Sequence, residues 1–162
     1  MPSDYLLEIE GIKGESKDSK HPNTIEIESY SWGNTNDGSS AHGSGGGAGK
    51  VHFQDVHFTS QVNKASPELM LACANGKHFK KAQLFVRKQG ENQQDYYVVT
   101  LEDFIVSSYQ SGGSNGSNHL PTDQFALNFA KIKFEYKPQK DDGTLDPAVT
   151  TGWDLKQNKK TG

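Results

Sequence analysis

Glycine supplies seven of the seventeen residues from Gly33 to Gly49, and this stretch joins two segments that both have the composition of β-strands. The two segments are residues 24–32 and 51–58, which are rich in β-branched and aromatic side chains. A β-hairpin usually closes with a two-residue turn, and unstructured loops longer than ~12–15 residues are uncommon in compact domains. We therefore expect residues 33–50 to form a functional loop, either a flap over a ligand site or an arm that contacts another molecule.

The composition limits the class of protein. The chain has 162 residues, which suits one domain, and we expect residues 1–162 to form it. The formal net charge is −3, with both signs scattered along the chain, so no basic surface for nucleic acid or for an anionic membrane is expected. The sequence contains no run of about 18 apolar residues, so no membrane insertion is expected.

Cysteine use and the first residues indicate where the protein is made. Cys73 is the only cysteine, which excludes an internal disulfide and a zinc site built from several cysteines. The N-terminus lacks the basic and apolar regions of a secretory signal peptide. These features favour synthesis in a reducing cytosol.

Short segments of alternating apolar residues predict a mainly β fold. Besides the two segments that flank the glycine-rich stretch, strands are expected at residues 5–9, 82–87, 96–101, 104–109, 125–136 and 152–155. In both flanking segments the apolar residues change from one set of alternate positions to the other, near Ser29 in the first, which indicates bent strands or strands covered on both faces. We expect an antiparallel β-barrel of two packed sheets, with a polar tail from about residue 137.

Residues 66–76 form the one convincing helix in the sequence. Ser66 is expected to cap its first N–H groups, Pro67 suits the first turn, and Gly76 suits a left-handed stop. The middle of the segment, from Leu69 to Ala74, is apolar all round. A surface helix should keep a polar stripe, so we expect this helix on the flank of the barrel, covered on more than one side.

Two motifs suggest enzymes, but both lack the sequence context that the chemistry needs. Residues 45–50 resemble a phosphate-binding loop, yet Val51 stands where a Ser or Thr would hold magnesium, and a strand follows instead of a helix. Residues 112–116 match the G-x-S-x-G elbow of hydrolases, with Ser114 as nucleophile and His119 as candidate base, but again no helix follows. The six histidines form no evident ligand set. We expect no catalytic site, no metal and no cofactor.

Six motifs occur in a fixed order along most of the chain. They are Ile9-x-Gly-x-Lys-Gly-Glu-Ser-Lys-Asp18, Tyr30-Ser-Trp-Gly33, Gly46-Gly-Ala-Gly-Lys-Val-His-Phe-Gln-Asp55, Ser66-Pro-Glu-Leu-Met70, Cys73-Ala-Asn-Gly-Lys-His78 and Leu127-Asn-Phe-Ala130. In this order and combination they resemble the haemolysin-coregulated protein (Hcp) family, the tube proteins of type VI secretion.

The resemblance implies a structural function. In such proteins a β-barrel subunit with one lateral helix forms hexameric rings, and the rings stack into a tube that a contractile sheath drives out of the cell. The lumen would carry effector proteins, and spike and baseplate proteins would be further partners. The resemblance also implies export from the bacterial cytoplasm by the type VI system without a cleaved signal peptide.

The resemblance also directs attention to particular residues. In the family the long loop reaches neighbouring subunits, and it corresponds to residues 33–50 here. The candidates for the ring and stacking interface are Gly33, Ser39, His42, Gly46, Gly47, Lys50, Gln89, Gly90 and Trp153. The candidates for a surface that faces the lumen are Glu26, Glu28 and Ser31.

Two other functions stay open at this level. The chain could be a monomeric β-barrel that binds a small ligand under a glycine-rich flap, or a hydrolase that uses Ser114 and His119. The mass in solution separates the ring from the monomer. Loss of hydrolytic activity on replacing Ser114 by alanine would identify the enzyme.

Overall fold

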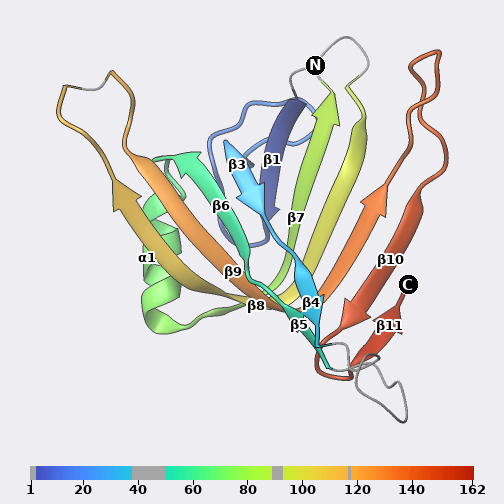
Figure 1. Ribbon diagram of the computed structural model, residues 1–162. Coiled ribbons are helices and arrows are strands. Elements are labelled where there is room, and N and C mark those ends of the chain that lie inside the picture. Colours follow the sequence, from blue (N-terminus) through green and yellow to red (C-terminus); the bar gives the residue numbers. More distant parts are fainter. Residues whose placement is uncertain (1–2, 38–49, 89–92, 117) are drawn as a thin grey trace.

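The computed structural model describes residues 3–37, 50–88, 93–116 and 118–162 (Figure 1). Its one helix within these residues is α1 (Ser66–Asn75). Its strands are β1 (Ser3–Ile9), β2 (Ile25–Glu26), β3 (Ser29–Ser31), β4 (Asn34–Asn36), β5 (Val51–Phe53), β6 (Val56–Gln61), β7 (His78–Lys88), β8 (Asp95–Gly112), β9 (Thr122–Tyr136), β10 (Val149–Asp154) and β11 (Lys159–Thr161). The predicted mainly β, antiparallel fold with one short helix on its flank is therefore confirmed.

Strand β9 organises the main sheet. Along one edge it pairs with β8 over its whole length. Along the other edge its first half, 122–127, pairs with β6, and its second half, 131–136, pairs with β10. The sheet continues from β8 through β7 and β1 to β2, and from β10 to β11. Because one long strand serves two different neighbours on one edge, the sheet divides into two arms (Figure 1).

The predicted strand at 24–32 is broken near Ser29, where its change of apolar positions indicated a bend or cover on both faces. Strand β2 pairs with β1, whereas β3 pairs with β6. Between them the N–H of Ile27 donates to the carbonyl of Tyr5 at 2.9 Å, and the N–H of Glu28 donates to the carbonyl of Thr59 at 2.7 Å. The segment thus passes from one side of the curved sheet to the other. The strand ladders do not complete a closed barrel, since within the described residues the main sheet ends at β2, at β11 and, through β6, at β3.

The second flanking segment, 51–58, is also broken. Its first part is β5, which pairs with β4 as a separate two-stranded ribbon, and its second part belongs to β6 in the main sheet. The expected loop at 33–50 is therefore shorter than its predicted bounds, because residues 34–36 form β4 and pair with residues 51–53. The fold therefore has two antiparallel sheets, as expected: one is the curved nine-stranded sheet and the other is this two-stranded ribbon.

The strands predicted at 96–101 and 104–109 form one long bent strand, β8. The bend contains Asp103, whose φ of 52° lies in the left-handed region, and a second irregularity follows between Val106 and Ser108. As a result Leu101 and Phe104, three residues apart, both enter the core. An uninterrupted strand would place them on opposite faces.

Helix α1 packs against β8 and begins differently from the prediction. The residue before its first turn is Ala65, and no side chain caps the helix, so the assignment of Ser66 as N-cap was wrong. The Ser66 hydroxyl instead donates to the carboxylate of Asp123, which is fully buried in β9. The stop at Gly76 is confirmed, with φ 66°.

The helix covers the sheet with one face only. Leu69 and Ala72 are buried in the core, whereas Met70 and Leu71 are 52% and 58% exposed. The expectation of cover on more than one side is therefore not met within a single chain. The helix leaves two large apolar side chains on the surface.

Candidate assembly surface

One face of the sheet is lined by uncharged polar side chains. We call it the polar face: the outward side of β3, β6, the 122–127 half of β9 and the 106–112 half of β8. Directly paired residues point to the same side of a sheet. One row across these four strands is Ser29, Thr59, Gln124 and Gln110, and the next is Ser31, His57, Ala126 and Ser108. In these two rows only Thr59 and Ala126 are not exposed.

The opposite side of the same four strands belongs to the core. Phe58 and Phe125 stack there with ring centroids 5.3 Å apart. Tyr109 donates its hydroxyl hydrogen to Asp123 at 2.7 Å and is half-buried. The strands therefore have an ordinary apolar inner face and an outer face of amides and hydroxyls.

The polar face is bounded by two strand edges that lack a strand partner within the described residues. Strand β3 pairs with β6 on one side and with no strand on the other. The ladder between β8 and β7 ends at the pair Ile105 and His78, so the 106–112 half of β8 pairs only with β9. Unpaired edges are open to further strand pairing, so a native protein must cover, charge or pair them.

The candidate lumen residues lie at different places on this surface. Glu26, Glu28 and Ser31 are all exposed. Ser31 lies on the polar face, and Glu28 lines a hollow of about 540 Å³ at its margin. Glu26 pairs with Leu6 of β1 and is not part of the polar face. Whether these side chains line a channel stays a prediction.

Three candidate interface residues lie near the ribbon of β4 and β5. Trp153 of β10 and residues 34–36, 51 and 53 of the ribbon line a hollow of about 310 Å³. The carbonyl of Gly33 accepts a hydrogen bond of 2.9 Å from the N–H of Gln54, and Lys50 is exposed. The structure thus brings the two ends of the glycine-rich stretch close to Trp153. The other candidates, Ser39, His42, Gly46, Gly47, Gln89 and Gly90, lie outside the described residues.

The hydrolase motif has no nucleophile elbow around it. Ser114 lies in the connection between β8 and β9 and is exposed, as is His119. Both line the hollow of 540 Å³, but the element after Ser114 is β9, where the elbow requires a helix. Within the described part of the chain no three His, Cys, Asp or Glu residues are grouped to hold a metal. No helix there is long and apolar enough to cross a membrane.

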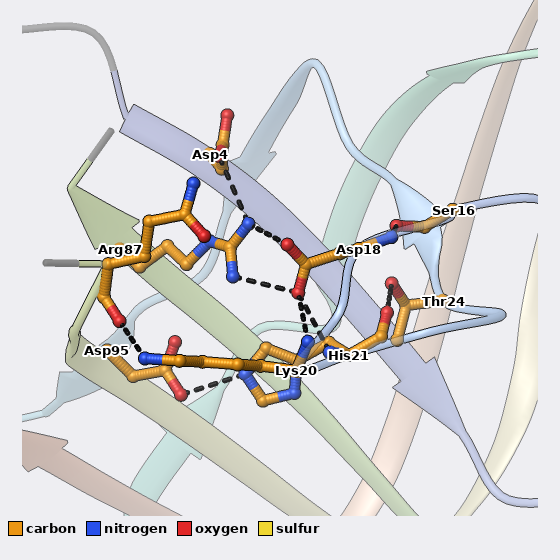
Figure 2. Close-up of polar contacts among 9 residues, drawn as sticks. Asp4, Ser16, Asp18, Lys20, His21, Thr24, Arg87 and Asp95 are labelled. Carbon is orange, nitrogen blue, oxygen red and sulfur yellow. Dashed lines mark hydrogen bonds and ion pairs between the residues drawn. The ribbon is translucent and has the colours of Figure 1, made fainter. Parts of the chain in front are cut away.

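A buried ionic cluster holds residues 11–24 against the outer side of β1 and β7 (Figure 2). The side chain of Arg87, 3% exposed, donates to both carboxylate oxygens of Asp18 and lies 3.4 Å from Asp4. The backbone N–H groups of Lys20 and His21 also donate to Asp18, at 3.0 and 2.8 Å. Four donors therefore fix one carboxylate of the segment to the sheet.

His21 adds a second attachment of the same segment. Its ring stacks on Phe85 with centroids 4.0 Å apart, and its Nε2 lies 2.9 Å from Asp95 (Figure 2). These contacts cover Phe85 of β7, which is only 9% exposed. The segment 11–24 therefore covers the outer side of this arm of the sheet.

The Arg87 cluster makes stability depend on pH in the acid range. Chiefly because the Arg87 guanidinium hydrogen-bonds to it, the pKa of Asp18 falls from 3.8 to about 2, against the opposing effect of burial. Between these values the folded state binds fewer protons than the unfolded state. We expect the contribution of Asp18, about 2 kcal/mol, to be complete above pH 4 and to disappear as the pH falls to about 2.

Urea unfolding at pH 6, 4 and 3 checks this expectation. The Asp18→Asn variant removes the titrating group, so its free energy of unfolding should fall less steeply between pH 4 and pH 3 than that of the native protein. Other acids titrate in the same range and affect both proteins alike, so the difference between the two slopes isolates Asp18. Parallel slopes would contradict the assignment.

Several residues of this surface were not predicted. The glutamines Gln61, Gln110 and Gln124 line the hollow together with Glu28, but only Gln61 belongs to a recognisable sequence pattern. His57, Thr59 and Gln61 alternate with buried residues along β6, and this period of two could have identified an exposed face. The positions of Gln110 and Gln124 depend on strand register, which the sequence pattern does not determine.

Comparison with known proteins agrees with the architecture. Residues 6–136 match the family model described as type VI secretion system effector, Hcp. The chain is 46% identical over 160 residues to Protein hcp1 of Pseudomonas aeruginosa, covering 98% of each chain.

Solved structures show the same fold. A structure described as a type six secretion system protein superposes with a TM-score of 0.94 at 26% identity, covering 99% of this chain and 100% of that one. The crystal structure of Hcp1 from Salmonella typhimurium superposes with a TM-score of 0.79 at 33% identity, again covering 99% of this chain and 100% of that one. With its matching family model, close curated relative and shared fold, the chain belongs to the Hcp family of the type VI secretion system.

Proposed function

We propose that six copies of this chain close into a ring, and that the rings stack into the inner tube of a type VI secretion system. Effector proteins travel in the channel, and the tube is expelled by a contractile sheath together with spike and baseplate proteins. The role is structural, without catalysis. The protein is made in the bacterial cytoplasm and leaves through this system without a cleaved signal peptide.

One observation carries the proposal beyond family membership: the polar face lies between two strand edges that have no strand partner in the described part of the chain. A polar outer face is ordinary for a soluble sheet. Here the two rows between β3 and the 106–112 half of β8 hold amides, hydroxyls and one imidazole but no carboxylate, lysine or arginine, and the edge strands on both sides have no further strand partner within the described residues. If the β3 edge of one copy adjoins the β8 edge of the next, both edges are covered and the polar faces form a continuous wall around water. Head-to-tail contacts of this kind close a ring when the rotation between copies allows it.

Stacking requires further contacts at the two ends of the ring. Our candidates for these contacts are the ribbon of β4 and β5, the hollow beside Trp153, and the glycine-rich stretch between the two strands of the ribbon. Glycine suits such a position because it permits close approach of two chains.

The ring is tested by mass and by imaging. We expect native mass spectrometry to give six times the 17.8 kDa mass of one chain, and negative-stain images to show rings with a central hole. A single 17.8 kDa species at high concentration and moderate salt would contradict the ring and would favour the monomeric ligand-binding alternative.

Cross-linking tests which edges meet. In a Cys73→Ser background, Ser31→Cys and Ser108→Cys place one thiol near each edge of the polar face. We expect a short bis-maleimide reagent to give a ladder of covalent multimers that ends at six. As matched control, Ser31→Cys with Lys131→Cys places the second thiol on β9 between β8 and β10, away from any open edge, and should give no ladder. Equal ladders from both pairs would contradict the edge-to-edge arrangement.

A further inference from the structure

The hollow of 540 Å³ at the margin of the polar face has a distinct chemical character. Gln61, Gln110 and Gln124 line it together with hydroxyl residues of β8, β9 and their connection. Among its described lining residues Glu28 alone carries a carboxylate, and none is lysine or arginine. The site therefore offers hydrogen bonds without a cation that could hold a phosphate or an acidic ligand.

The register of the strands gathers the three amides. Gln110 and Gln124 are direct partners on β8 and β9, so their side chains are neighbours on the same face. Gln61 pairs with Thr122, two residues before Gln124 on β9, so it lies diagonally across from Gln124 on that face. All three glutamines are exposed. Within the part of the chain that the structure describes, their side-chain amides make no hydrogen bond to the protein.

Amide side chains complement a peptide backbone. Each glutamine provides one carbonyl acceptor and two N–H donors, and an extended backbone presents the same two kinds of group in alternation. The direct partners Gln110 and Gln124 are about 5 Å apart, and Gln61 is about 7–8 Å from Gln124 across the diagonal, so one short segment can reach more than one of them. Among the described lining residues no aromatic ring of Phe, Tyr or Trp is present for a sugar or a base to stack on.

We infer that this hollow binds an extended, uncharged polar segment of polypeptide through the amides of Gln61, Gln110 and Gln124. That the segment belongs to an effector inside the channel rests on the proposed function; the binding itself does not. Three solvent-exposed amides give only weak binding, with Kd about 1 mM for one copy. Contacts with several copies around a ring would hold a cargo by multivalency and still allow its release.

Saturation-transfer difference NMR suits such weak binding and provides the test. The probe is a synthetic twelve-residue peptide of Gly, Ser, Thr and Asn, titrated against the full-length protein. We expect saturable binding to the native protein and at least a tenfold weaker Kd for the double variant Gln110→Ala/Gln124→Ala. The matched control Gln94→Ala/Gln157→Ala removes two exposed glutamines elsewhere and should bind as the native protein does.

Three results would overturn the inference: no binding to the native protein, unchanged binding to the Gln110→Ala/Gln124→Ala variant, or equal binding of a peptide in which half of the residues are glutamate. Displacement of the peptide by an equal concentration of a neutral disaccharide would also overturn it. Imaging both proteins separates this inference from the ring. Rings without peptide binding would refute the site alone, whereas single chains that bind the peptide through these amides would refute the ring alone.

Discussion

Replacing Leu69 by aspartate is expected to unfold the protein, whereas the same replacement at Met70, one residue along the helix, is not. Leu69 is fully buried in the core, where α1 packs against β8. The substitution removes a large apolar side chain and places a carboxyl where nothing pairs with it. Together these effects should cost at least about 4 kcal/mol, a large part of the total stability of a domain.

Met70→Asp is the matched control, because it introduces the same charge on the same helix at a side chain that is 52% exposed. We expect it to cost about 1 kcal/mol or less, as surface substitutions usually do. Urea unfolding followed by circular dichroism measures both variants. Equal destabilisation by the two variants would show that α1 does not pack on the sheet through its Leu69 face.

Met70→Asp also tests the exposed side of the helix. If α1 packed against another copy through Met70 and Leu71, the variant would keep its fold but lose rings in negative-stain images. If these side chains stay on the surface of the assembly, rings would persist. The pair of variants therefore separates a contribution to folding from a contribution to assembly.

Beside the glycine-rich stretch the sequence predicted bent strands or strands covered on both faces, because each segment carries a local signal; the structure breaks both segments into separate strands. Near Ser29 the apolar residues change from one face to the other, and the chain does leave β1 for β6 at that point. What could not be predicted is which strands become the new neighbours. That choice depends on contacts between residues far apart in sequence, and the alternation of apolar residues carries no information about it.

The cap of α1 was predicted wrongly for a related reason. Ser66 has the residue type and position of an N-cap, but its hydroxyl donates a hydrogen bond to the buried carboxylate of Asp123, 57 positions later in the chain. Without Ser66 the buried carboxylate of Asp123 would keep, among the described residues, only the Tyr109 hydroxyl as a side-chain donor. Leaving its second oxygen without that hydrogen bond would cost more than leaving the first N–H groups of a helix without a side-chain cap. Local propensity was therefore overridden by a contact that only the folded structure reveals.

The candidate site was predicted in part. Ser31 was identified as a lumen candidate, and the structure places it on the polar face, in the row next to the one that contains Gln110 and Gln124. Gln110 follows the irregularity of β8 between Val106 and Ser108, and Gln124 lies near the beginning of β9. The alternation of neighbouring residues therefore does not show on which face of the sheet either side chain lies. The ionic cluster around Arg87 was not predicted at all, because its partners lie on a loop and on two strands.

Arg87→Ala is expected to destabilise the protein by about 3–5 kcal/mol, the usual cost of removing one partner of a buried ion pair. The guanidinium is the one side-chain cation that contacts Asp18 in the described structure, and it also lies near Asp4 (Figure 2). Without it the Asp18 carboxylate keeps only two backbone N–H donors while it stays 11% exposed. Residues 11–24 should then separate from β7.

Two comparisons make this prediction specific. Lys88→Ala removes a half-buried cation at the next position of β7. Among the described residues no buried acid is paired with this cation, so the variant should cost about 1 kcal/mol or less. In the Asp18→Asn background the cost of Arg87→Ala should shrink by about 1–3 kcal/mol, because the carboxylate that it would leave unpaired is already gone. Arg87→Ala should also abolish the difference in acid sensitivity between the protein that keeps Asp18 and its Asp18→Asn variant, since the guanidinium is the main cause of the lowered pKa of Asp18. If Arg87→Ala and Asp18→Asn instead destabilise the protein additively, the two residues do not stabilise it as a pair. Residues 11–24 are then held chiefly by His21 and its neighbours.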